Sequence, residues 1–150
     1  MAVYKRGASD GDVNHFPKKF VTLYSTGAVT AGDFVSIHTT DTTNAIGGTV
    51  LIAPAVGTNG CSAVVGIATE TVLAADAPQN IVVQLAGKYD TANVHADTVA
   101  GIALCGPISV AGRADVTVAA SFQNVAIALT DDSAVTNQAA VMIINQGVFD

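Results

Sequence analysis

Side chains that could do chemistry are few in this chain, and their spacing favours none of the common catalytic or metal-binding sites. The histidines His15, His38 and His95 lie far apart in the sequence. Neither Cys61 nor Cys105 has a second cysteine or a histidine at the spacing of a zinc site. The glycine-rich loops that bind nucleotide phosphates are absent too. We therefore expect no catalytic residue, no metal ion and no cofactor.

An acidic stretch near the start of the chain, Asp10–Asn14, begins like a calcium-binding loop. Such a loop also needs a glycine at its sixth position and a glutamate at its twelfth. This chain has His15 and Val21 there, so the stretch predicts a solvated turn. The only glutamate is Glu70, so a pair of catalytic carboxylates would have to come from aspartates.

The composition points towards assembly and away from nucleic acid. Only 12% of the 150 residues are charged, about half the ordinary share of ~25%, although 50% are hydrophobic. A chain with so few charges is poorly protected against association. The net charge of −6 also lacks the basic surface that nucleic-acid binding needs. We expect a homo-oligomer that does not bind nucleic acid.

The charge is unevenly distributed along the chain. Residues 1–19 hold four cations and two acids, whereas residues 20–150 hold two cations and ten acids. Residues 1–19 show no strand-like alternation, and Pro17 suits an extended segment. They form either a solvated terminus or an extended arm that docks on an acidic neighbouring subunit. The residues that we expect to dock are Tyr4, Lys5, Arg6, His15, Phe16, Lys18 and Lys19.

Residues 42–69 contain no charged side chain, but they do not predict a membrane span. A spanning helix needs about 20 predominantly apolar residues, whereas glycine, proline and asparagine interrupt this run every few positions. The remaining pieces have the length of strands and are rich in valine and isoleucine. We expect the uncharged connection between them to lie in an oligomer interface. Its candidate residues are Leu51, Ile52, Pro54 and Val56.

Short apolar runs and glycine-rich turns continue throughout residues 20–150. They predict a single, compact, all-β domain of about nine short strands, as in a β-barrel or a β-sandwich. The segment 131–145 also fits a helix capped by Asp132 or Ser133, but its β-branched end favours a strand. The expected strands are 20–25, 33–39, 49–53, 62–68, 80–86, 98–105, 115–119, 125–130 and 139–145.

Alternation within two of these strands predicts which side chains share a face. Apolar residues occupy every second position of Ile81–Leu85, with Gln84 on the opposite face. In Val125–Leu129 large apolar residues alternate with Ala126 and Ala128, so both faces are apolar. We therefore expect this strand to be covered on both sides by closely packed neighbours.

The two cysteines and the first residues of the chain indicate where it is made. Cys61 and Cys105 both lie in apolar runs, which fits two buried thiols or a disulfide pair. The opening sequence, MAVYKRGASDGD, has no apolar core of the kind found in a secretory signal. We expect synthesis in the cytoplasm.

Two stretches carry a resemblance to a known family. In AVVGIATETVLAADAPQNIVVQLAGKYD a strand ends in VGIA, a short polar step follows, and the strand NIVVQLAGKY closes on a glycine. Earlier, AVTAGDFVSI places a Gly-Asp turn before a strand. Over about residues 20–112 the chain resembles the small head decoration, or cement, proteins of tailed bacteriophages. That family commonly has a glycine turn before the second of these strands, where this chain has DAPQN.

The resemblance implies a non-enzymatic β-barrel or tulip-like domain that binds the outer surface of a viral capsid. Such proteins often form trimers and bridge neighbouring capsomers, which secures the shell against internal DNA pressure. The implied partner is the major capsid protein, and the implied location is the virion. The family has no catalytic residues to transfer to this chain.

Two other functions remain open on the sequence alone. One is a different virion β-structure, such as a tail tube, a fibre or an adhesin domain, which oligomer symmetry would distinguish. The other is a ligand-binding β-sandwich. The absence of tryptophan and the presence of only three tyrosines leave few stacking platforms for a sugar.

Overall fold

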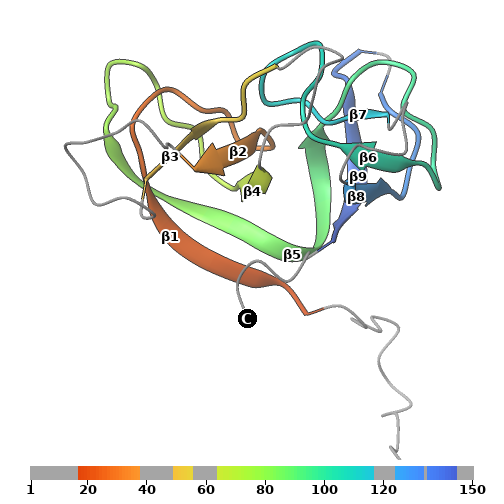
Figure 1. Ribbon diagram of the computed structural model, residues 1–150, viewed down its shortest axis with the longest axis horizontal. Helices are drawn as coiled ribbons and strands as arrows, with labels where there is room; N and C mark the ends of the chain where they lie inside the picture. The colour runs from red at the N-terminus through yellow and green to blue at the C-terminus, as the bar shows by residue number, and fades with distance from the viewer. Residues whose placement is uncertain (1–16, 38–48, 56–63, 117–123, 134, 145–150) are drawn as a thin grey trace, which may run out of the picture.

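The computed structural model of the chain describes residues 17–37, 49–55, 64–116, 124–133 and 135–144. These residues are all-β, and their nine strands confirm the predicted fold class (Figure 1). Across those ranges no helix has the length and apolar character needed to cross a bilayer. The strands are β1 Lys19–Ser25, β2 Phe34–Ile37, β3 Thr49–Ile52, β4 Val64–Ala68, β5 Gln79–Asn93, β6 Ala103–Cys105, β7 Asp115–Val116, β8 Asn124–Ala128 and β9 Gln138–Ile143.

The first five strands form a closed barrel. Its strand order is β1-β3-β2-β4-β5, and β1 closes it by pairing antiparallel with β5 from Lys19↔Ala86 to Ser25↔Gln79. Only β1 and β3 run parallel. The alternation predicted for Ile81–Leu85 is confirmed, because Ile81 and Val83 are buried in the barrel core. That core consists of Val29, Val35, Val50, Ala68, Val72, Ile81 and Val83.

A second sheet continues from the far half of β5. Its order is β5-β9-β8-β6-β7, and all of its strand pairs are antiparallel. A parallel bridge between Val94 and Ala114 brings the β7 end of the sheet back to the end of β5. Figure 1 shows the barrel and the second sheet side by side, with β5 running through both. One long strand therefore sets the position of the two halves.

Strand β5 is twice as long as the sequence predicts, and Gly87 is the reason. The prediction ended the strand at Ala86 because a glycine and several polar residues follow. Gly87 has a φ of +90°, a conformation that glycine adopts at little cost. The chain turns there while its pairing continues, because Gly87 lies opposite Ile143 of β9. The predicted loop is thus the second half of a bent strand.

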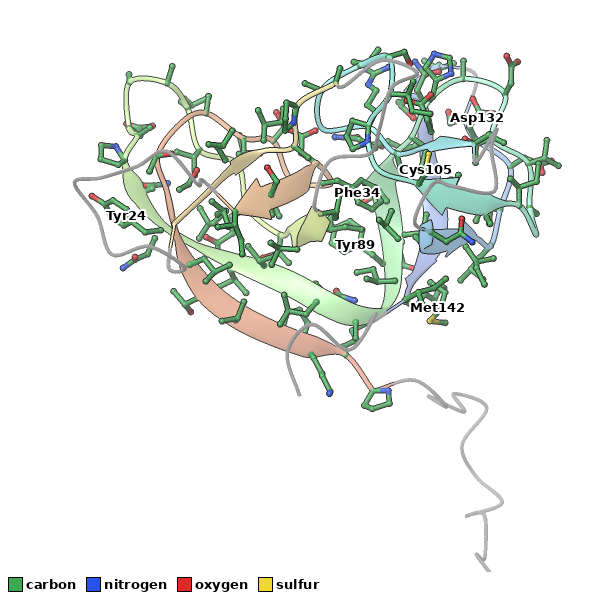
Figure 2. The ribbon with its side chains drawn as sticks, in the orientation of Figure 1. Tyr24, Phe34, Tyr89, Cys105, Asp132 and Met142 are labelled. Carbon is green, nitrogen blue, oxygen red and sulfur yellow. The ribbon has the colours of Figure 1, made fainter. Side chains whose placement is uncertain are left out.

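The second sheet packs on the outside of the barrel. Phe34, Ile67 and Gln84 form one row across β2, β4 and β5, on the face opposite to the barrel core. All three are buried, and Figure 2 shows Phe34 between the two halves. Six of the twelve buried residues in this second core are alanines, so the sheet approaches the barrel closely. The core consists of Phe34, Ala53, Ile67, Ala92, Val94, Leu104, Ala114, Ala126, Ala128, Ala139, Val141 and Ile143.

The prediction that both faces of strand β8 are covered is wrong. Ala126 and Ala128 point into the second core and are fully buried. Ile127 and Leu129 point the other way and remain 38% and 40% exposed. The small side chains face inward because the barrel lies close to this side of the sheet. The larger apolar side chains are left on the solvent side.

Two predicted segments differ from the structure at their ends. Of the strand predicted over 98–105, only β6 (Ala103–Cys105) forms, and Thr98 lies outside it with its carbonyl accepting a hydrogen bond from the Asp132 N–H. In the segment 131–145 the helix alternative is wrong. Residues 131–133 and 135–137 lie outside strands and helices, and β9 follows.

Candidate interaction surfaces

Serine, histidine and aspartate do gather at one point of the fold, beside β7. The Asp115 carboxylate accepts hydrogen bonds from the backbone N–H groups of Ile108 and Ser109, at 2.8 and 3.1 Å. The Ser109 hydroxyl lies 3.2 Å from both carboxylate oxygens. His95 Nδ1 lies 3.6 Å from Asp115 Oδ1 and 2.9 Å from the carbonyl oxygen of Ala96.

This arrangement differs from a catalytic triad in its order. In a triad the histidine lies between the serine and the aspartate and accepts the serine proton. Here the serine hydroxyl contacts the carboxylate directly. Asp115 is buried and binds two successive backbone N–H groups of the loop before it. The cluster therefore holds the loop from Ile108 onward against β7.

A buried carboxylate joins the barrel to the second sheet. Asp33 Oδ2 accepts a hydrogen bond of 2.8 Å from the Thr30 N–H, and Oδ1 accepts one of 2.8 Å from the Asn93 side chain. Asn93 in turn accepts a hydrogen bond of 3.0 Å from the Gln138 side chain on β9. Burial raises the pKa of the Asp33 carboxyl, while the bonds from Thr30 and Asn93 and the charge of Arg113 act against that rise. This hydrogen-bond network links the barrel to the second sheet.

We expect the contribution of Asp33 to stability to fall as the pH rises. Its pKa in the folded state lies above the ordinary value of 3.8, so the folded state holds this proton more tightly than the unfolded state. That stabilisation is present below the ordinary pKa and is lost as the pH rises through the folded-state pKa. The substitution Asp33→Asn removes the titrating group and keeps its shape. Urea unfolding from about pH 4 to about pH 7 should show the advantage of the wild type over Asp33→Asn shrinking. An advantage that grows with pH would contradict this assignment.

The basic residues predicted to dock lie only partly within the described chain. Lys18 packs its backbone against Gly87, since a Cβ atom placed on that glycine would lie 3.0 Å from Lys18 Cα. Lys19 is the first residue of β1 and is exposed, as is the neighbouring Phe20 at 53%. The other predicted docking residues lie outside the described residues: Tyr4, Lys5, Arg6, His15 and Phe16.

The predicted interface residues are divided between the barrel wall and its surface. Ile52 is partly buried and packs against the barrel core, opposite Val35. Leu51 is partly buried too, and Pro54 is exposed. Val56 lies outside the described residues. The prediction that these residues meet another subunit stays a prediction.

A different apolar surface, on the solvent side of the second sheet, was not predicted from the sequence. We call it the outer face and define it as Ala103, Ile127, Leu129 and Met142. Ile127 lies opposite Ala103 on β6 and opposite Met142 on β9, so the three side chains share one side of the sheet. The signal in the sequence was the absence of any polar residue from Val125–Leu129.

The first part of β1 forms a second surface that a partner could use. Of the residues of β1, only Tyr24 and Ser25 pair with β3. In the described ranges, residues 19–23 therefore have a partner strand on one edge, which is β5. An open strand edge carries unpaired backbone groups that can receive a strand from another protein.

One short sequence motif is diagnostic only when it lies on a particular backbone structure. Residues 7–11 read Gly-Ala-Ser-Asp-Gly, which matches the G-x-S-x-G pattern of α/β-hydrolases. That pattern carries a nucleophile on a sharp turn between a strand and a helix. Residues 7–11 lie outside the described residues, and the nine elements that are described are all strands.

Within the described ranges no three His, Cys, Asp or Glu side chains lie together as a metal site would require. Cys105 is buried, as predicted for its apolar run, and its Sγ lies 3.5 Å from the carbonyl oxygen of Asp115. Cys61 lies outside the described residues. In comparisons with known proteins, no family model matches the chain, and no curated protein is significantly similar to it.

Proposed function

We propose that this chain is a capsid decoration, or cement, protein that binds the outer surface of a viral shell and bridges neighbouring capsomers. The observation that carries the proposal is the first part of β1, where residues 19–23 pair only with β5 within the described ranges and Phe20 is 53% exposed. A strand edge of this kind can receive a strand from another protein. The all-β barrel and the likeness of residues 20–112 to head decoration proteins agree with it.

The mechanism that we propose is stabilisation of the shell by many weak contacts. The major capsid protein would meet the edge of β1 at residues 19–23, which has no partner strand within the described ranges and where Phe20 and Lys19 are exposed. Strand addition at such an edge gains backbone hydrogen bonds, and nearby side chains give specificity. On a symmetric shell each contact is repeated, so avidity makes a modest affinity per site sufficient. A homotrimer would supply three such edges at once.

The predicted role of the basic arm can be tested by removing residues 1–16, which leaves β1 whole. We expect the shortened chain to melt as the wild type does and to lose at least about tenfold in affinity for shells of the major capsid protein, which is ~1.4 kcal/mol. Co-sedimentation with purified shells measures the occupancy. Heating the decorated shells and following DNA release measures the stabilisation. Unchanged occupancy would show that the arm does not contribute.

A further inference from the structure

The outer face is continuous across three strands and ends at a cluster of acids. Leu129 donates its backbone N–H to the carbonyl oxygen of Ala140 on β9. Leu129 lies two residues after Ile127, and Ala140 lies two residues before Met142, which is opposite Ile127. Leu129 therefore lies on the same side of the sheet as Ile127 and Met142. Beyond Leu129 the turns 97–100 and 129–132 lie side by side. Asp131 accepts a hydrogen bond of 2.9 Å from the Ala100 N–H. Figure 2 shows Met142 and Asp132 at opposite ends of this half of the molecule.

The charges at the two ends of the outer face differ. At the Leu129 end lie Asp97, Asp131 and Asp132, and none of them forms an ion pair with another described residue. At the Met142 end Lys88 lies opposite Met142 and pairs with Asp90 at 2.8 Å. The Leu129 end therefore carries uncompensated negative charge, whereas at the Met142 end the cations Lys88 and Lys18 lie near Asp90.

One segment of this chain has the matching chemistry. Residues 1–6 read Met-Ala-Val-Tyr-Lys-Arg, with four apolar or aromatic residues followed by two cations and no acid before Asp10. Apolar residues suit the outer face, and Lys5 and Arg6 suit the acids at its Leu129 end. Complementary charge of this kind guides association and fixes the register. We propose that residues 1–6 of one copy of this chain dock on the outer face of a second copy.

The contact is assigned to two copies because a chain with only 12% charged residues is poorly protected against association. Lys18 lies against Gly87, next to Lys88, so a chain's own arm starts at the Met142 end of the outer face, and a wild type that docks its own arm would stay monomeric in the test below. Each copy offers one arm and one face, so the contact is head-to-tail and produces a ring when its rotation closes. This inference concerns copies of the chain in solution and holds whether or not they bind a shell.

The head-to-tail geometry makes a strict test possible with two full-length variants. Ile127→Lys places a charge on the outer face and leaves the arm intact, whereas Lys5→Glu/Arg6→Glu reverses the arm and leaves the face intact. Sedimentation equilibrium should show self-association of the wild type and a loss of at least about tenfold in affinity for each variant alone. An equimolar mixture of the two variants should form dimers with one copy of each and nothing larger, because only one intact arm and one intact face remain.

The matched control is Leu73→Lys, which makes the same change at an apolar residue that is 61% exposed on the barrel half. It should associate as the wild type does. Thermal melting of each variant confirms that it is folded. A second pair of substitutions, Asp97→Asn/Asp132→Asn, keeps the shape of both side chains and removes their charge. It should weaken association, more at low salt than at high salt, and should add little further loss when combined with Lys5→Gln/Arg6→Gln.

Three results would overturn the proposal. If Lys5→Glu/Arg6→Glu associates as the wild type does, the arm is not the occupant and the face pairs with something else. If Ile127→Lys associates normally, the outer face is not used. If the wild type stays monomeric at every concentration, or the mixture yields no dimer, copies do not meet head-to-tail. None of these measurements involves a shell, so they are independent of whether the chain decorates one.

Discussion

Replacing Phe34 by alanine should lower the free energy of unfolding by about 3–5 kcal/mol, the usual range for a buried phenylalanine. Phe34 is fully buried on β2, opposite Ile67, and projects from the barrel wall into the core beneath the second sheet. Its backbone also links the halves, because its N–H donates to the Gly112 carbonyl and its carbonyl accepts from Ala53. The alanines around it cannot fill the cavity that the ring leaves.

Urea unfolding monitored by circular dichroism measures this loss. The matched control is Phe20→Ala, because Phe20 is 53% exposed, and we expect it to cost less than about 1 kcal/mol. Phe34→Leu retains most of the side-chain volume and should fall between the two. If Phe34→Ala costs no more than Phe20→Ala, the second sheet does not depend on this ring for its packing.

The second large effect is expected from Gly66→Ala, at about 1–3 kcal/mol or more. Gly66 lies in the middle of β4, where the strand passes close to β5. A Cβ atom at this position would overlap the backbone oxygen of Gln84 and would lie 2.8 Å from Val83 Cγ1. A backbone oxygen cannot rotate aside as the end of a side chain can. The two strands would have to separate, and they form the wall between the two cores.

Two other glycines separate crowding from backbone strain. A Cβ atom on Gly27 would meet nothing within 4 Å, so Gly27→Ala should change the unfolding free energy little. Gly101 is equally open but has a φ of +87°, so Gly101→Ala should cost about 1–2 kcal/mol through strain alone. The order of loss is then Gly66, Gly101 and Gly27, measured by the same unfolding experiment. A loss at Gly27 equal to that at Gly66 would refute the crowding argument.

The sequence predicted the elements of this fold better than their extent. Each expected strand is present because short runs of β-branched residues between glycine-rich turns have few other stable structures. The prediction failed at Gly87, because a glycine followed by polar residues marks a turn in most chains. Whether a strand continues through a bend depends on a partner, here Ile143, which lies more than fifty residues further along the chain.

The candidate surfaces were predicted even less completely, since they depend on how the halves meet. Alternation in Val125–Leu129 showed two apolar faces and gave no reason to prefer either. The tertiary structure decided between them, because the second sheet lies so close to the barrel that alanine fits on the inner side. The same choice put Ile127 and Leu129 on the outside.

The sequence by itself determined that the chain is all-β, poor in charge, and basic only at its start. These properties follow from the residue types and from their order along the chain, and neither depends on contacts between distant residues. Three features were decided by the tertiary structure alone. Strand β5 belongs to both sheets, and the Asp33 carboxylate accepts a hydrogen bond from Asn93 where the two sheets meet. The outer face, with Ile127 and Leu129 exposed, ends beside Asp97, Asp131 and Asp132. Those features depend on contacts between residues far apart in the sequence, and such contacts exist only once the two halves have packed together.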